Sequence, residues 1–415
     1  MILETSNHII LLNFDFPPNP GIGGRRWAAL AQGLAEKGIQ VHVIKSAYSG
    51  KKISNWHAAV DHPNIHLHEI TPVSKLHLTP YNKKLLNSIH FRTELIRMKF
   101  LEKGTPFDKS IGMKEAVINK LQQLTSTHTV NWIIATGAPF NFPYYASLFV
   151  EKNPGFKLWV DLRDPWLNAQ NYGMSNLSTT RYTVEKEKAR HIFQYAQVVS
   201  SPSIHVLQEF NSVVREELKT KYFELKHFST SAHQTTPSHP SPHLLTITYG
   251  GAIYLRTETF LEQMANDLRA LRELQPLLYK KLRILFFSPD FQKIKEVFSE
   301  HDIVSVQGDI GGDIVKRWSE SDYTLILLAE HNKDFLTTKF YECLSLQKTL
   351  LYLGPNGRVQ EEIISKNHGI LWDQLVSKLK NNEFFKKENS IGLEDVQNAS
   401  VSGRVEELLN KMNSI

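Results

Sequence analysis

The 415-residue sequence has very little cysteine, no long apolar run and no basic amino-terminal segment, and each absence excludes a class of protein. Its single cysteine, Cys343, cannot form an internal disulfide, which favours a reducing compartment such as the cytoplasm. No apolar run reaches about 18 residues, so we expect no membrane-spanning helix. The first residues, MILETSNH, include an acid and lack the basic region of a secretory signal. The sequence therefore predicts a globular cytoplasmic protein.

Positive charge is in modest excess and is unevenly distributed. The net charge is +6 and the pI is near 9.0, which favours an anionic partner. Residues 75–104 hold seven Lys or Arg against two Glu, with apolar residues interleaved. This pattern is typical of a peripheral contact with an anionic membrane, although a solvated helix face over a core is an alternative interpretation. We expect no nucleic-acid partner.

Strand and helix patterns alternate in two sets, which predicts two parallel sheets covered by helices. The first set has apolar strand patterns at 8–14, 40–46, 131–137, 157–162 and 196–203, and the second at 244–251, 282–289, 303–309, 323–329 and 349–354. Between them, STSAHQTTPSHPSPH is rich in proline and polar residues and reads as a linker. The predicted domains are 1–228 and 244–390, with a linker at 229–243 and a helical tail at 391–415.

A glycine-rich turn follows the first predicted strand and opens a helix. In DFPPNPGIGGRRWAALAQGLAEKGIQVHVI, Gly23 and Gly24 precede Arg25 and Arg26. A dinucleotide fingerprint requires a third glycine where Arg26 stands, so this sequence disfavours NAD binding. Exposed N–H groups and cations at a helix start suit a phosphate or a carboxylated sugar. A tight turn with surface arginines is the alternative.

Several motifs resemble those of one enzyme family. FPPNPGIGGRRWAALAQGLAEKGIQVHVI resembles the amino-terminal signature of retaining GT-B glycosyltransferases of family 4, and similar segments follow in the same order: TGAPFNF, LWVDLRDPW, ITYGGAIYLRTETF and TTKFYECLSLQKTLLYLGP. The resemblance implies an α/β protein of GT-B architecture, with two Rossmann-like domains facing each other across a cleft. It further implies an acceptor-binding first domain and a donor-binding second domain.

The resemblance also indicates the residues that bind the donor, a nucleoside-diphosphate sugar. Lys339 and Glu342 are three apart at the start of a predicted helix, so they share a face. Glu342 is expected at the ribose hydroxyls, whereas a lysine and a helix start can neutralise a diphosphate. The predicted catalytic residues are Arg256, Lys339 and Asp334; the further predicted donor contacts are Gly23, Gly24, Arg25, Gly250, Gly251, Thr337 and Thr338. Surface roles are the alternatives for Glu342 and Arg256.

The acceptor side is predicted around the segment DLRDPW and the first turn of the helix after TGAPFNF. Asp161, Arg163 and Asp164 lie at the end of a buried strand, where charges are tolerated only when they are paired. Acceptor recognition and a structural ion-pair network are both consistent with that pattern. Tyr144 stands in the segment FNFPYY, which lacks the histidine that many relatives place there.

The reaction implied by these residues is transfer of a sugar to an acceptor hydroxyl with retention, in bacterial polysaccharide or glycolipid biosynthesis. No D-x-D motif occurs in a suitable place, so we expect neither a metal nor another cofactor at the site. The linker histidines lack an ordered ligand spacing and are not expected to bind metal. Two alternatives stay open: a sugar-nucleotide epimerase on the same fold, and a non-catalytic protein that binds a sugar nucleotide or a membrane surface.

Overall fold

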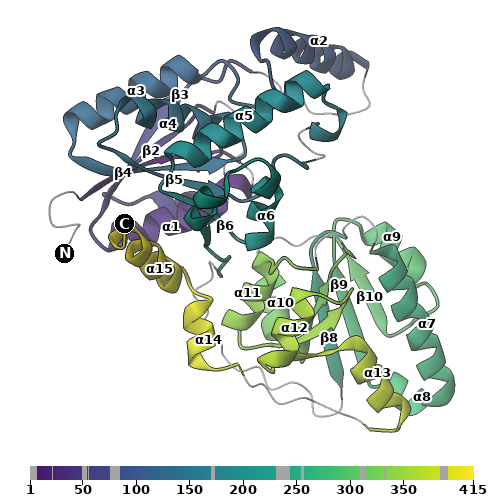
Figure 1. Cartoon of the computed structure of the whole chain (residues 1–415). Helices are drawn as coiled ribbons and strands as arrows, with labels where there is room; N and C mark the ends of the chain where they lie inside the picture. The colour runs from purple at the N-terminus through teal and green to yellow at the C-terminus, as the bar shows by residue number, and fades with distance from the viewer. Residues whose placement is uncertain are drawn as a thin grey trace. The chain divides into compact units, whose positions relative to one another are not determined.

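The computed structural model describes residues 7–20, 22–48, 54, 56–74, 85–169, 173–229, 244–253, 257–308, 314–330, 333–383 and 391–415, without the side chains of 59 and 85–88. The chain divides into two compact units (Figure 1). The first consists of Met1–Lys226 together with Arg404–Ile415, and the second of His227–Gly403. Within the described residues, no helix is long and apolar enough to cross a membrane.

The first unit is built on a seven-stranded parallel sheet in the order β3-β2-β1-β4-β5-β6-β7. Its strands are β1 (His8–Leu12), β2 (Gln40–Ser46), β3 (Ile65–Ile70), β4 (Val130–Gly137), β5 (Lys157–Leu162), β6 (Val198–Ser201) and β7 (Tyr222–Glu224). Ile10 of β1 pairs with His42 on one side and Ile133 on the other. The central strands are buried on both faces, which explains their continuous apolar runs.

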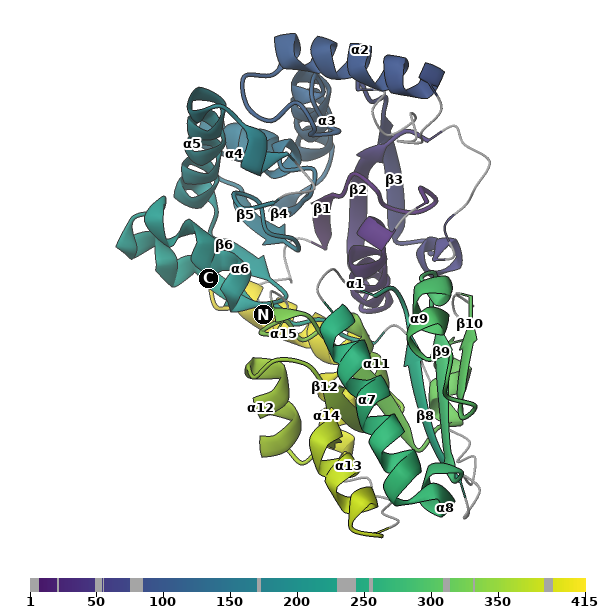
Figure 2. The same cartoon turned by 90° about the vertical axis from the view of Figure 1, so that its right-hand side faces the viewer.

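Helices cover both faces of this sheet. They are α1 (Arg25–Glu36), α2 (Leu85–Leu101), α3 (Lys114–Thr127), α4 (Asn141–Lys152), α5 (Thr179–Tyr195), α6 (Ile204–Gln208) and α15 (Val401–Asn413), with 3-10 turns η2 (Ile22–Gly24), η3 (His57–Val60), η5 (Met174–Asn176), η6 (Glu209–Ser212) and η7 (Glu216–Lys221). Helices α3, α4 and α5 share one core with Ile10, Ile133 and Val160. Figure 2 shows α2 at the edge of the unit, away from the sheet.

Helix α1 shows how local sequence fixes an element. Its alanines and leucines form a buried stripe, and Gly38 adopts φ +85 just after the helix ends, as a terminating glycine does. Helix α15 lies on the same side: Lys37, just after α1, pairs with Glu406 at 3.5 Å, and Lys411 covers the ring of Phe223. The end of the chain, Arg404–Ile415, is thus part of the first unit (Figure 1).

The second unit holds a six-stranded parallel sheet in the order β10-β9-β8-β11-β12-β13. Its strands are β8 (Leu245–Gly250), β9 (Leu282–Phe287), β10 (Val304–Gln307), β11 (Tyr323–Leu327), β12 (Thr349–Leu353) and β13 (Gly369–Leu371). Its helices are α7 (Glu258–Leu274), α8 (Pro276–Tyr279), α9 (Phe291–Val297), α10 (Ile314–Ser319), α11 (Thr338–Ser345), α12 (Arg358–Ser365), α13 (Trp372–Lys380) and α14 (Leu393–Asn398). Two apolar cores lie on the two faces of the sheet, one with α7 and α13 and one with α11 and α12.

The α/β prediction with two Rossmann-like units is confirmed by these two sheets. Most of the predicted linker lies outside the described residues. The segment 391–415, predicted as one helical tail, is divided by the structure: α14 lies in the second unit, whereas residues from Arg404 onward join the first. The apolar pattern at the tail's end finds its partner in the first unit, where Val405, Leu408 and Met412 are buried.

Each sheet has a position where the strand order reverses, between β1 and β4 in the first unit and between β8 and β11 in the second. In open parallel sheets, ligands bind outside the carboxyl ends of the strands at such a position. The residues that follow β1, β4, β8 and β11 are therefore the first places to look for chemistry. The glycine-rich turn follows β1, and the Thr337–Glu342 segment follows β11.

Candidate functional site

The turn after β1 is fixed by buried polar contacts. Asn13 donates to the hydroxyl of Thr136 at 3.1 Å, which joins the carboxyl ends of β1 and β4. Asn19 donates to the carbonyl oxygen and the hydroxyl of Ser46 at 3.0 and 2.8 Å and to the carbonyl of Phe14. The turn is therefore anchored to the ends of its neighbouring strands before any ligand binds.

The two glycines of this turn serve different purposes. A Cβ atom at Gly24 would collide with the backbone carbonyl of Asp15, so this glycine is required for packing. At Gly23, a Cβ would lie 3.1 Å from a carboxylate oxygen of Asp15 and 3.7 Å from the guanidinium of Arg163. Arg25 begins α1 and its guanidinium covers the ring of Trp56 at 5.3 Å. Of the predicted contacts here, Gly23 is the one that faces charged side chains.

Asp161 is a buried anchor of the fold. One of its carboxylate oxygens accepts from Arg26 Nε at 3.2 Å and from Trp27 Nε1 at 2.7 Å, and the other accepts from Ser200 at 2.6 Å. Arg26 also donates to the backbone carbonyls of Leu225 and Lys226. The network joins α1 to β5, to β6 and to Leu225 and Lys226, where the segment Met1–Lys226 ends. For Asp161, this arrangement agrees with a role in a structural ion-pair network, which is one of the two interpretations of its sequence segment.

Arg163 and Asp164 lie further out than Asp161. They form an ion pair at 2.5 Å, with side chains 25% and 38% exposed. Lys109 approaches the carboxylate of Asp15 at 3.5 Å. Asp15, Lys109 and Arg163 thus place two cations and an anion around Gly23, at the carboxyl ends of β1 and β5. Sequence reasoning missed Lys109, because it comes from an irregular segment distant in sequence.

Tyr144 lies elsewhere, in the wall of a cavity of about 940 Å³ within the first unit. The cavity lies among the end of α2, the start of α3, and helices α4 and α5. Its lining holds Tyr145 and charged groups of both signs: Lys103, Lys114, Lys188, Arg190, Glu102, Glu115 and Glu187. The four predicted acceptor residues therefore occupy three different settings: a buried anchor, an exposed ion pair and this cavity.

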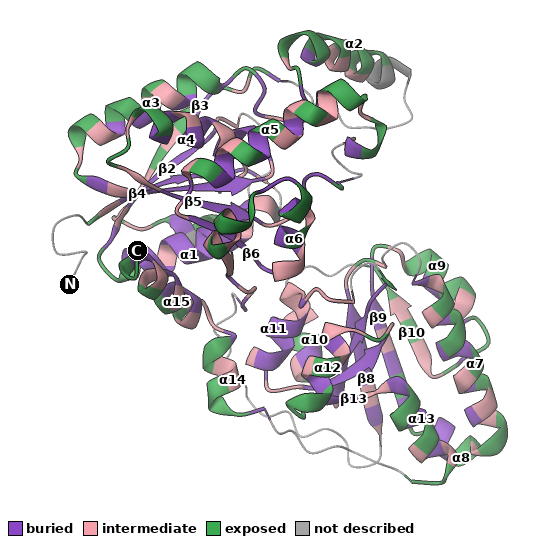
Figure 3. Cartoon of the chain, viewed as in Figure 1, coloured by how far each residue is buried: buried purple, intermediate pink, exposed green. Residues whose placement is uncertain are grey.

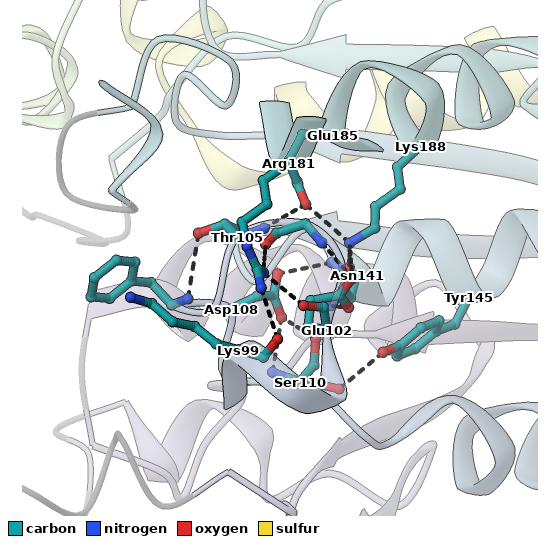
Figure 4. A network of polar contacts seen from close by, with 12 residues as sticks. Lys99, Glu102, Thr105, Asp108, Ser110, Asn141, Tyr145, Arg181, Glu185 and Lys188 are labelled. Atoms are coloured by element: carbon teal, nitrogen blue, oxygen red, sulfur yellow. Dashed lines mark hydrogen bonds and ion pairs between the residues drawn. The ribbon is translucent and has the colours of Figure 1, made fainter. Parts of the chain in front are cut away.

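A buried polar network holds the cavity in shape (Figure 4). Lys188 bridges Glu185 at 3.0 Å and Glu102 at 3.1 Å and donates to the side chain of Asn141 at 2.7 Å. Asp108 accepts from the backbone N–H of Asn141 at 3.0 Å, at the start of α4, and burial raises the pKa of Asp108. Such groups are stable inside a protein because they are paired and hydrogen-bonded. No periodic pattern in the sequence predicts this network.

In the second unit, the strand β8 ends at Gly250 and Gly251, and the two again differ. A Cβ atom at Gly250 would collide with Ile314 of α10, so this glycine allows the helix to pack on the strand. Gly251 adopts φ +115, and a Cβ there would lie 3.0 Å from Nζ of Lys339. The structure thus brings Gly251 and Lys339 together, as the sequence predicts.

Lys339 lies in the first turn of α11 with its ammonium 4.2 Å from the ring centroid of Tyr249. Burial of the ammonium lowers the pKa of Lys339 to about 8, although the side chain as a whole keeps partial exposure. Within the described part of the chain, Nζ makes no hydrogen bond or ion pair. The carboxylate of Glu342, three residues along the helix, acts on the ammonium through space and favours its charged form. A desolvated cation that makes no ion pair, at a helix start, is suited to bind a phosphate group.

The other predicted donor residues of the second unit differ in their surroundings. Glu342 is 6% exposed on the inner side of α11, so it is not the exposed carboxylate that the sequence predicts. Thr337 caps the amino end of α11 and Thr338 begins it. Asp334 accepts from the backbone N–H of Arg358 at 3.1 Å, at the start of α12. Arg256 lies outside the described residues, and its role stays a prediction.

Solved structures with a similar fold cover nearly the whole chain. An E. coli trehalose-6-phosphate protein bound with UDP-2-fluoro glucose is 11% identical, with a TM-score of 0.60 over 98% of this chain and 99% of that one. A lipopolysaccharide outer core galactosyltransferase is 13% identical, with a TM-score of 0.58 over 98% and 99%. A putative UDP-N-acetylglucosamine 2-epimerase from Listeria monocytogenes is 10% identical, with a TM-score of 0.52 over 99% and 96%. At these identities the likeness establishes the fold.

No family profile matches the sequence, and no curated protein matches it either. The chain therefore shares an architecture with glycosyltransferases and with an epimerase, while its own residues must carry any functional argument.

Proposed function

We propose that this protein is a glycosyltransferase that moves a sugar from a nucleoside-diphosphate sugar to an acceptor hydroxyl with retention. The observation that carries the proposal is the ammonium of Lys339, desolvated and without a hydrogen bond or ion pair among the described residues, at the start of α11 and beside Gly251. A diphosphate would supply the missing negative charge. The fold shared with a galactosyltransferase and with a UDP-sugar complex supports this donor class.

The proposed chemistry needs positioning and charge stabilisation more than covalent help. The transition state separates charge between an oxocarbenium-like sugar and a departing diphosphate, and groups that stabilise the leaving diphosphate supply most of the rate enhancement. Lys339 and the backbone N–H groups of Thr337 and Thr338 act on the diphosphate in this scheme, and Arg256 is proposed to assist. Gly251 leaves room for close approach of the phosphates.

For the acceptor, we propose the cavity beside Tyr144. Tyr144 and Tyr145 in its lining suit a sugar ring. Lys103 and Lys114 suit a negatively charged group such as the phosphate of a lipid-linked sugar, whereas Arg190 is paired with Glu187 of the same lining. The end of α2 lines the same cavity. A lipid-linked acceptor would fit a role in bacterial polysaccharide or glycolipid biosynthesis.

Helix α2 supports a peripheral membrane contact at the inner face of the cell membrane. Ile89, Ile96 and Phe100 are 50%, 54% and 88% exposed, at helical spacing, and Figure 3 shows the helix largely exposed. Arg92 and Lys99 are exposed on the same turns. Apolar and basic side chains on one exposed helix face suit an anionic lipid surface. The predicted segment 75–84 lies outside the described residues.

The membrane proposal predicts that Phe100→Ser weakens binding to phosphatidylglycerol vesicles by about tenfold, because a large exposed ring leaves the lipid interface. Cosedimentation at low and high salt measures this, with binding lost at high salt. Leu277→Ser is the matched control, since Leu277 is 78% exposed on α8 of the second unit. Equal vesicle binding by both variants would contradict the proposal.

The transfer proposal is tested by screening nucleoside-diphosphate sugars for thermal stabilisation, because a bound ligand raises the melting temperature. The stabilising donor is then incubated with extracted lipid acceptors, and sugar transfer is followed by mass spectrometry. We expect stabilisation by one base and sugar, acceptor-dependent release of the nucleoside diphosphate, and loss of transfer in Lys339→Met. Absence of stabilisation by every donor would reject the proposal.

The second candidate is a sugar-nucleotide epimerase, which the likeness to the Listeria monocytogenes structure favours. An epimerase returns an altered sugar nucleotide without an acceptor. Chromatography of the nucleotide sugar after incubation alone distinguishes the two reactions: a new epimer favours this candidate, and an unchanged donor favours transfer.

A further inference from the structure

Five histidines gather on one face of the first sheet, close to the amino ends of its strands. They are His8 in β1, His42 in β2, His66 and His68 in β3, and His128 just before β4. The strand register explains the cluster: His42 pairs with His66, and side chains two residues apart on a strand point to the same face. This end of the sheet is opposite to the carboxyl ends where the glycine-rich turn lies.

Three of these rings are stacked on one another, and one nitrogen atom of each lies close to those of the other two. Nδ1 of His8 lies 3.0 Å from Nε2 of His42, and the rings of His42 and His128 are 4.4 Å apart between centroids. One ligand nitrogen from each of His8, His42 and His128 lies within 4.8 Å of the other two. Three imidazoles with an open fourth position form a ligand set that zinc uses.

The surroundings of the three rings match those of metal ligands. Nδ1 of His42 lies 3.3 Å from Nε2 of His68, so His42 can donate there while its Nε2 stays available. Histidine ligands commonly donate their second ring nitrogen to a neighbour, which fixes the tautomer. His66 in turn lies 2.7 Å from the side-chain oxygen of Gln40. His66 and His68 thus lie beside the three proposed ligands and are not ligands themselves.

The three rings differ in burial. His42 is 4% exposed. His8 and His128 are partly exposed, which leaves an entry for an ion and a position for water.

We propose that His8, His42 and His128 bind one divalent transition-metal ion, of which Zn²⁺ is the expected type, with water in the fourth position. Binding breaks the hydrogen bond between His8 and His42. The proton on His8 Nδ1 moves to Nε2 of the same ring, and Nδ1 binds the metal. His42 binds through Nε2 and keeps its Nδ1 proton, which it donates to His68. The three histidines stay neutral, and the only atoms added to the protein are the ion and its water.

The role of this site differs from sugar transfer. Its ligands come from β1, β2 and the junction between α3 and β4, so the ion would fasten these segments together. The site lies at the amino ends of the strands and is independent of the proposed diphosphate site in the second unit. The expectation of metal-independent transfer is therefore unaffected.

The test uses the full chain without a histidine tag, freed of metal by chelation. Calorimetry with Zn²⁺ is expected to show one saturable site, and Co²⁺ is expected to give the intense visible absorption of a tetrahedral complex. His128→Gln is expected to weaken Zn²⁺ affinity at least about 100-fold, and His68→Phe about tenfold. His205→Gln, at a partly exposed histidine of α6, is the matched control and should bind as the parent chain does.

Because His42 is buried, the variants chosen are at the partly exposed His8 and His128, and circular dichroism verifies that each variant is folded. Loss of affinity in both His8→Gln and His128→Gln, with unchanged circular dichroism, supports the site. Absence of saturable binding to the parent chain overturns it. Equal affinity of His128→Gln and His205→Gln overturns it as well, since binding would then reside elsewhere.

Discussion

The charged groups at the carboxyl ends of the two sheets differ in their hydrogen-bond and ion-pair partners. In the first unit, Asp161 is buried and engaged by Arg26, Trp27 and Ser200. In the second unit, the ammonium of Lys339 has an aromatic face beside it and the Glu342 carboxylate nearby, but within the described residues it makes no hydrogen bond or ion pair. Removing one member of a buried ion pair destabilises the fold, whereas a desolvated cation that makes no ion pair can bind an anion from solution. The hydrogen-bond and ion-pair partners of Asp161 therefore assign it to the fold, whereas their absence at Lys339, among the residues described, agrees with a role in binding.

The largest expected effect comes from breaking the pair in the first unit. Asp161→Asn leaves the guanidinium of Arg26 buried beside a neutral group, which is expected to cost about 3–5 kcal/mol of the stability of that unit. Hydrogen exchange of β5, measured by mass spectrometry, reports it for this unit separately. Asp164→Asn is the control, since its ion pair is partly exposed and should contribute less than about 1 kcal/mol. Equal effects of the two variants would contradict the comparison.

Removing the charge in the second unit is expected to affect binding and not folding. Lys339→Met deletes a charge-assisted contact worth about 1.5–3 kcal/mol, so affinity for a nucleoside diphosphate falls about 10- to 100-fold without loss of thermal stability. Calorimetry measures it. Lys348→Met is the matched control: burial lowers the pKa of Lys348 too, but this residue precedes the amino end of β12. A lower melting temperature with unchanged affinity in Lys339→Met would assign Lys339 to the fold.

The pKa of Lys339 gives the comparison a pH dependence. Below about pH 8 the ammonium is charged and diphosphate affinity is constant. Above it, the free protein loses this proton and must regain it to bind, so Kd rises by up to roughly tenfold per pH unit. Calorimetry between about pH 7 and about pH 9.5 shows the change of slope. In Lys339→Met the slope near pH 8 should vanish, and a slope that persists would assign it to another group.

Gly251→Ala is expected to have the smallest effect. At φ +115 a side chain is strained, which costs about 1–2 kcal/mol of the stability of the second unit. The new methyl group also approaches Nζ of Lys339, so diphosphate affinity should fall modestly. Gly308→Ala is the control, because no atom lies within 4 Å of a Cβ built there. Thermal unfolding and calorimetry of both variants measure the difference, and identical results would remove the special role of Gly251.

The sequence predicted the fold well where apolar runs are continuous. Strands β1, β4, β5, β8, β11 and β12 follow from buried runs of leucine, isoleucine and valine. Strand β3 was missed, because IHLHEI at the edge of the sheet alternates histidine with apolar residues and is only half buried. The contact of Gly251 with Lys339 was predictable because both follow strands beside the point of reversal.

Other parts of the site were not predictable from local pattern. The cavity beside Tyr144 depends on Lys188, Glu102 and Glu185, which come from different helices and carry no common spacing. Asp334 was predicted as a catalytic residue; its carboxylate also accepts from the backbone N–H of Arg358, a contact that the sequence does not display. Side-chain partners of this kind depend on tertiary packing, which a single sequence does not display.

The return of the chain to the first unit at Arg404 has a practical consequence for dissecting the protein. Two covalent crossings join the units, near 226 and near 403, so one proteolytic cut in the segment between the sheets would leave them tethered. A fragment ending at residue 226 would lack the side chains of Val405, Leu408 and Met412, which are buried in the whole chain. An isolated first unit therefore has to be made as a circular permutant, with residues 404–415 fused ahead of residue 1 through a flexible spacer.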